Sequence, residues 1–89
     1  MPTISMFYGI IIYMYFFDNE RHSLPHIHAR YQGQMGAFSI VDGALLSGDI
    51  PMPKVKLVQA WIEIHREELL ADWELAVNGE PTFRIDPLR

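Results

Sequence analysis

The sequence contains no cysteine among its 89 residues. The chain therefore has no disulfide, no zinc ribbon and no cysteine nucleophile, which excludes thiol redox chemistry. Basic residues are also few, since seven lysines and arginines stand against eleven aspartates and glutamates, a formal net charge of −4. Proteins that coat nucleic acid need excess cations to displace counterions from phosphates. A nucleic-acid partner is therefore not favoured by charge, although the count leaves room for a local basic groove.

Long hydrophobic segments of the kind that cross membranes are absent as well. The longest apolar run, Met6 to Phe17 (MFYGIIIYMYFF), is shorter than the about 20 residues that a membrane helix needs. No lysine or arginine precedes it and no small-residue cleavage site follows, so it does not resemble a signal peptide. The sequence also lacks a phosphate-binding glycine loop, a nucleophile elbow and an H-E-x-x-H motif. We expect a cytoplasmic protein without membrane contact.

The short chain predicts a single domain, residues 1–89, with turn residues between the predicted elements. Runs of β-branched and aromatic residues predict strands at about 7–17, 26–31, 35–41 and 44–47. Between the last two strands, Asp42-Gly43 is a strong hairpin signal, because both turn positions need a positive φ.

Apolar residues repeat with a helical period after Pro53, which suits the first turn of a helix. The repeat predicts a helix at about 53–78, either a single straight or kinked helix or two helices meeting near His65-Arg66. The tail 80–89 is predicted to be an extended arm. The expected fold class is α+β: an antiparallel sheet of three to four strands, followed by a long C-terminal helix packed on one face.

Three of the four histidines lie within the segment HSLPHIHARY, residues 22–31. Side chains alternate along a strand, so His26, His28 and Arg30 share one face. The apolar residues between them should face the helix, which turns both imidazoles away from it.

A metal site is one interpretation of this segment. Two imidazoles that are two residues apart on a strand can converge on one divalent ion, zinc or a similar metal. His26 and His28 would be two of the ligands. The third would be His22, Asp18 or Asp42.

Two further interpretations stay open. His26 and His28 are candidates for an acid–base pair, because imidazole titrates near neutral pH. With Arg30 holding a phosphate, such a pair would suit metal-free RNA cleavage. Alternatively, the histidines are structural, or they form part of a protein–protein contact.

Several motifs together suggest a family. They are Met1-Pro2-Thr3-Ile4, Phe7, Gly9-Ile10, Met14-Tyr15, Asp18, Pro25-His26-Ile27-His28-Ala29 with Tyr31, Gly48-Asp49-Ile50-Pro51, Trp61, His65, Glu68-Leu69 and Trp73. On these motifs the chain resembles a small bacterial family known as a domain of unknown function (DUF4160-like). Where the family usually has two prolines before the first histidine of P-H-x-H, Leu24 replaces the first proline, which puts the placement of His22 in doubt.

The resemblance implies a protein partner rather than an activity. Members of this family often look like one half of a two-gene cassette of the toxin–antitoxin type. The family pattern points to Asp18, His22, His26, His28 and His65 as candidate functional positions.

The leading hypothesis from the sequence is a protein-interaction module that forms a homo-oligomer or binds a small partner protein encoded nearby. The alternative is a histidine-dependent ribonuclease or metal-binding enzyme that uses the face of His26 and His28.

Overall fold

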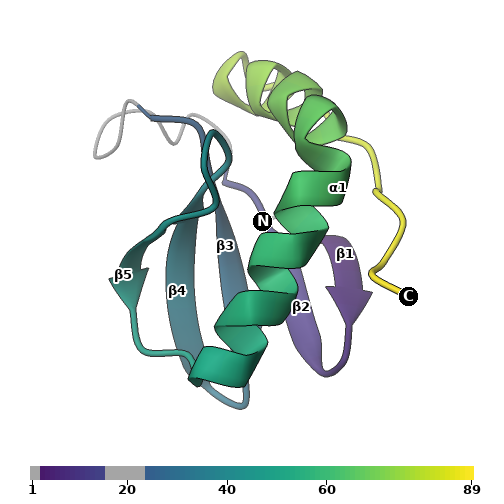
Figure 1. Cartoon of the computed structure of the whole chain (residues 1–89). Helices are drawn as coiled ribbons and strands as arrows, with labels where there is room; N and C mark the ends of the chain where they lie inside the picture. Colours follow the sequence, from purple (N-terminus) through teal and green to yellow (C-terminus); the bar gives the residue numbers. More distant parts are fainter. Residues whose placement is uncertain (1–2, 16–23) are drawn as a thin grey trace.

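The computed structural model describes residues 3–15 and 24–89. Along those residues the elements are β1 (Thr3–Phe7), β2 (Ile10–Tyr13), β3 (His26–Tyr31), β4 (Gln34–Ser39), β5 (Leu45–Gly48) and α1 (Met52–Val77). The strands form one antiparallel sheet in the order β1-β2-β3-β4-β5, and α1 crosses one face of it (Figure 1). The class is α+β, as expected.

The predicted three to four strands are wrong, because the sheet has five. The run predicted as one strand at 7–17 instead folds back on itself. Its chain reverses at Tyr8 and Gly9, whose φ values are 50° and 77°, and Phe7 then pairs with Ile10. Both arms of this hairpin bury apolar residues, so no polar residue marks the turn, and Gly9 is its one sequence signal. Residues 16–17 of the predicted strand lie outside the described part.

The core lies between the sheet and α1. The rings of Phe7 and Trp61 meet there at 5.3 Å between centroids. Ile12, Ile27 and Phe38 from the sheet are fully buried in the same cluster. Burying a side chain of this size stabilises the fold by about 1.5–3 kcal/mol each, so the contact of sheet with helix is the main source of stability.

The helix bends at His65, where φ is −111° and ψ is 22°. No proline or glycine lies near the bend, so backbone chemistry alone does not force it. Just beyond it, Nε of Arg66 donates a 2.8 Å hydrogen bond to the carbonyl oxygen of Ile40, next to the end of β4. The second half of α1 consequently passes over the end of the sheet at which β3 begins (Figure 1).

After α1, residues 80–89 run as an extended arm beside β1 (Figure 1). The Ile85 amide donates to the Ile4 carbonyl oxygen at 2.8 Å, and the Trp61 indole N–H donates to the Asp86 carbonyl oxygen at 2.8 Å. The arm thereby covers the free edge of β1.

Among the described residues, no helix combines the length and the apolar character that crossing a membrane requires.

Candidate functional site

We call the sheet face opposite α1 the outer face. Residues directly opposite each other on neighbouring strands point to the same side. The pairings Met6–Ile11, Ile11–Arg30 and Arg30–Met35 therefore set four side chains in one row across β1 to β4. This row is the open end of the outer face. The closed end lies where β3 begins, around His26, His28, Tyr13 and Tyr15.

His26 is fully buried at the closed end. Its ring lies 4.9 Å from that of Trp73, on the second half of α1, and 5.1 Å from that of His28, measured between centroids. The Nδ1 atom is 2.9 Å from the carbonyl oxygen of Leu24, which can only accept, so Nδ1 carries a proton and donates. The expectation that both imidazoles stand clear of the helix is wrong for His26, because the bend in α1 brings Trp73 over it.

His28 is only partly buried and lies among tyrosines. Its ring centroid is 4.6 Å from that of Tyr15 and 5.6 Å from that of Tyr13. Burial raises the pKa of the Tyr13 hydroxyl, the nearby Tyr15 raises it further, and the charge of Arg30 opposes the rise. Tyr13 is therefore a neutral phenol at physiological pH, packed against an imidazole.

The predicted site residues are placed as follows. His26 and His28 lie side by side and Arg30 is exposed on the same face, as the strand alternation predicted. The proposed ligands His22 and Asp18 lie outside the described residues. The Asp42 carboxylate accepts a 3.0 Å hydrogen bond from the Ala44 amide, which lowers its pKa and gives it a role in the turn.

No three histidine, aspartate or glutamate side chains within residues 3–15 and 24–89 are grouped so that they could hold a metal ion. The metal site therefore stays a prediction that rests on residues outside this part.

The open end was not found from the sequence. Met6 and Met35 are 55% and 43% exposed, and Ile11 between them is partly exposed. Beside Met6 and Ile11 lies a shallow hollow of about 390 Å³ that the hairpin turn at Gly9 completes. Arg30, in the middle of the row, forms no ion pair with any described residue. The signal in the sequence was Gly9, which marks the turn that brings Met6 beside Ile11.

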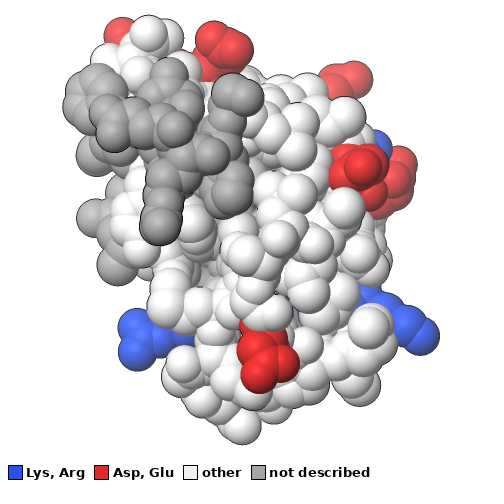
Figure 2. All heavy atoms as spheres, turned by 90° about the vertical axis from the view of Figure 1, so that its left-hand side faces the viewer, with Lys and Arg blue, Asp and Glu red and all other residues white. Residues whose placement is uncertain are grey.

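The two edges of the sheet offer less to a partner than its outer face. The arm covers the edge of β1. At the opposite edge, β5 is four residues long and has a register irregularity where Ala37 and Phe38 pair with it. Short, bulged edge strands pair poorly with other chains. Figure 2 looks at this side of the molecule, and few charged side chains lie on it.

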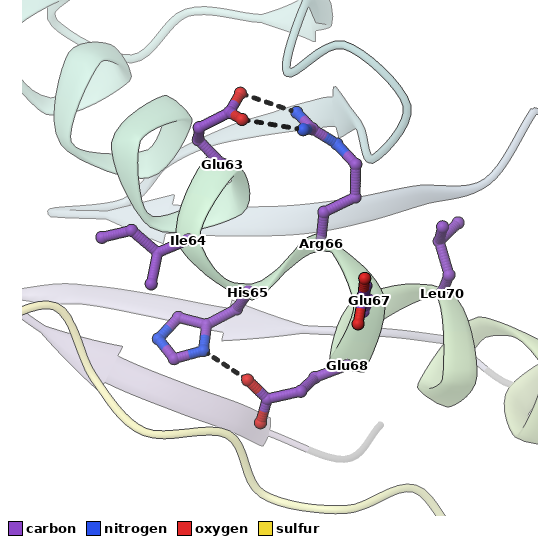
Figure 3. Close-up of a pocket in the computed structure, with 7 residues that line it drawn as sticks. All are labelled: Glu63, Ile64, His65, Arg66, Glu67, Glu68 and Leu70. Carbon is purple, nitrogen blue, oxygen red and sulfur yellow. Dashed lines mark hydrogen bonds and ion pairs between the residues drawn. The ribbon is translucent and has the colours of Figure 1, made fainter.

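A second hollow, of about 410 Å³, lies at the bend of α1 (Figure 3). Both guanidinium ends of Arg66 bond to the Glu63 carboxylate at 3.1 Å, which lowers the pKa of Glu63. His65 Nδ1 lies 2.6 Å from Glu68 Oε1. His65, a candidate from the family pattern, is thus paired with an acid on its own helix.

These observations define a small α+β protein with a helix on one face of its sheet and an apolar row on the other. The chain belongs to the family described as Domain of unknown function (DUF4160), whose pattern matches residues 9–74. The match runs from the hairpin turn at Gly9 into the second half of α1, and so includes His26, His28 and His65. No curated protein and no solved structure matches the chain.

Proposed function

We propose that the protein is a protein-interaction module that associates with copies of itself or with a small partner protein. The observation that carries this proposal is the open end of the outer face. An antiparallel sheet with one covered face usually presents polar residues on the other face. Here Met6, Ile11 and Met35 occupy three of the four positions in the row. Contiguous exposed apolar surface is typical of binding sites.

The role in a toxin–antitoxin-like pair is the finer part of the proposal. It is supported by the motifs that the chain shares with its family and by the acidic surface of α1, where Glu63, Glu67, Glu68 and Glu74 are exposed. An acidic surface suits a protein that binds a basic partner protein better than one that attacks RNA directly. We expect the partner to be encoded beside this chain.

The test is the molar mass in solution, measured by size-exclusion chromatography with light scattering, for the protein alone and mixed with the product of the neighbouring gene. Met35→Glu places a charge in the open end and should abolish either association. Met52→Glu is the matched control, because it makes the same change at an exposed methionine outside the outer face, at the start of α1. A wild type that is strictly monomeric and ignores the neighbouring product would refute the proposal, as would Met35→Glu behaving like wild type.

A histidine-dependent ribonuclease is the second candidate function. What favours it is the contact of His28 with His26 on one side, with the exposed Arg30 two residues along the same face. Because His26 is buried, His28 would be the group that reaches a substrate and Arg30 the one that binds its phosphate.

This second function predicts that His28→Ala and Arg30→Ala each abolish RNA cleavage without unfolding the domain. Arg84→Ala, at an exposed arginine of the arm, is the control. Cleavage that persists in the His28→Ala, Arg30→Ala double variant would rule the reaction out. Elemental analysis of untagged protein tests the metal-binding alternative separately.

A further inference from the structure

The row at the open end has an unusual charge arrangement. Arg30 is its one charged side chain, with Ile11 on one side and Met35 on the other. If two copies packed their outer faces together around a twofold axis, the two Arg30 guanidinium groups would approach each other in a contact that excludes water. Juxtaposed like charges strongly disfavour such a contact. The surface therefore suits an occupant that brings a carboxylate within an apolar patch.

A surface on α1, within the described residues, has that composition. At the bend of α1, Ile64 is 65% and Leu70 is 36% exposed, and both line the hollow of Figure 3. Glu67 lies between them in sequence and lines the same hollow. We call Ile64, Glu67 and Leu70 the kink surface.

Among the charged side chains that line the hollow of Figure 3, all are paired except Glu67. Arg66 binds Glu63, and His65 binds Glu68 (Figure 3). Glu67 is exposed and has no ion pair within the described part of the chain. An unpaired carboxylate between two exposed aliphatic side chains is the complement of the row around Arg30.

The row lies on the sheet face away from α1, whereas the kink surface belongs to the bend of α1 (Figure 1). A copy therefore cannot pair its own Arg30 with its own Glu67. We propose that copies of this chain associate head to tail, the open end of one copy docking on the kink surface of the next, with Arg30 of the first paired to Glu67 of the second. This inference rests on the proposed function, and it names the partner and the contact. Such a contact joins two different patches, so it forms a ring if the rotation closes and a growing chain otherwise.

Charge reversal tests the contact. Arg30→Glu and Glu67→Arg should each weaken association at least ~10-fold, since each places two like charges together. Glu74→Arg is the control, because it makes the same change in net charge at an exposed position of α1 outside the hollow. Sedimentation velocity measures the assembly, and unchanged melting temperatures show that the variants fold.

Mixing the two variants is the decisive step. In an equimolar mixture of Arg30→Glu and Glu67→Arg, each open end meets a kink surface of opposite charge, so assembly should return. Association of either single variant at wild-type strength would overturn the inference, as would a mixture that stays monomeric.

The outcomes separate this inference from the proposed function. If Met35→Glu abolishes association but Glu67→Arg does not, the open end binds another surface, so the head-to-tail contact falls and the interaction module stands. If the wild type is monomeric but binds the neighbouring gene product, the head-to-tail contact is likewise refuted and the interaction module stands. If the wild type associates neither with itself nor with the neighbouring gene product, the head-to-tail contact and the interaction module are both refuted.

Discussion

The two ends of the outer face are built on the same strands with the same alternation, yet their burial is opposite. At the closed end, the polar ring of His26 is fully buried, whereas at the open end the apolar Met6 and Met35 are exposed. The difference comes from α1, which bends at His65 so that Trp73 reaches one end of the face and not the other. Strand alternation decides which side a residue faces, and the path of the helix decides whether that side is covered.

The two ends of the outer face are expected to differ most in how much a substitution there lowers the stability of the protein. Trp73→Ala removes a large ring that packs on His26 and should lower the free energy of unfolding by about 3–5 kcal/mol. Met35→Ala at the open end should cost clearly less, about 1 kcal/mol, because that side chain is 43% exposed and loses only a weak 3.7 Å hydrogen bond from the Tyr13 hydroxyl to its sulfur. Urea denaturation at neutral pH measures both. Equal effects would show that the two ends do not differ as described.

A smaller effect is expected within the closed end. His26→Ala removes the hydrogen bond to the Leu24 carbonyl and a buried ring, and should cost about 1–3 kcal/mol of stability. His28→Ala should cost less, because His28 is only partly buried. The comparison uses the same denaturation measurement. If His28→Ala proves the more damaging of the two, burial is not what distinguishes these histidines.

The smallest effect concerns the pH dependence of the buried carboxyl next to Trp73. Burial raises the pKa of Asp72 above 3.8, although a hydrogen bond from the Phe83 amide at 2.8 Å opposes the rise and the nearby Glu68 adds to it. Its Oδ2 atom has no partner among the described residues. Between the unfolded and the folded pKa, the native chain holds a proton that the unfolded chain has released. The contribution of Asp72 to the free energy of unfolding therefore falls as the pH rises from the unfolded to the folded pKa, and it stays lower at neutral pH.

Asp72→Asn keeps the oxygen that accepts from Phe83 and removes the charge. The variant should gain stability relative to wild type as the pH is raised from about 4 to 7, by less than the losses above. Thermal unfolding at a series of pH values measures the difference. Glu74→Gln, at an exposed acid on the same helix, is the control. A difference that does not change with pH would contradict the assignment.

Local patterns predicted much of the fold. The α+β class followed from runs of β-branched residues and a helical repeat, and the shared face of His26 and His28 followed from strand alternation. The fifth strand was missed because both arms of the first hairpin are apolar, so the turn at Gly9 has no polar residue beside it. The burial of His26 could not be predicted, since it depends on a bend in α1 that brings together residues 47 positions apart.

The open end and the kink surface also escaped prediction. Met6 joins Met35 in one row only because four strands pair in a particular register. Glu67 differs from its acidic neighbours only because Arg66 and His65 engage the other two carboxylates once the helix has bent. The row depends on tertiary geometry that one-dimensional patterns do not contain, whereas the ion pairs at the bend join residues three apart on one helix.

The arm at residues 80–89 also bears on the order of folding. Its hydrogen bonds to Ile4 on β1 and to Trp61 on α1 join distant positions in the sequence, and a third goes to Asp72 on α1. Such long-range contacts form slowly, because the loop that joins them must close first. We therefore expect the arm to attach late, after the hairpin and the helix have formed, which would leave the edge of β1 unprotected until then.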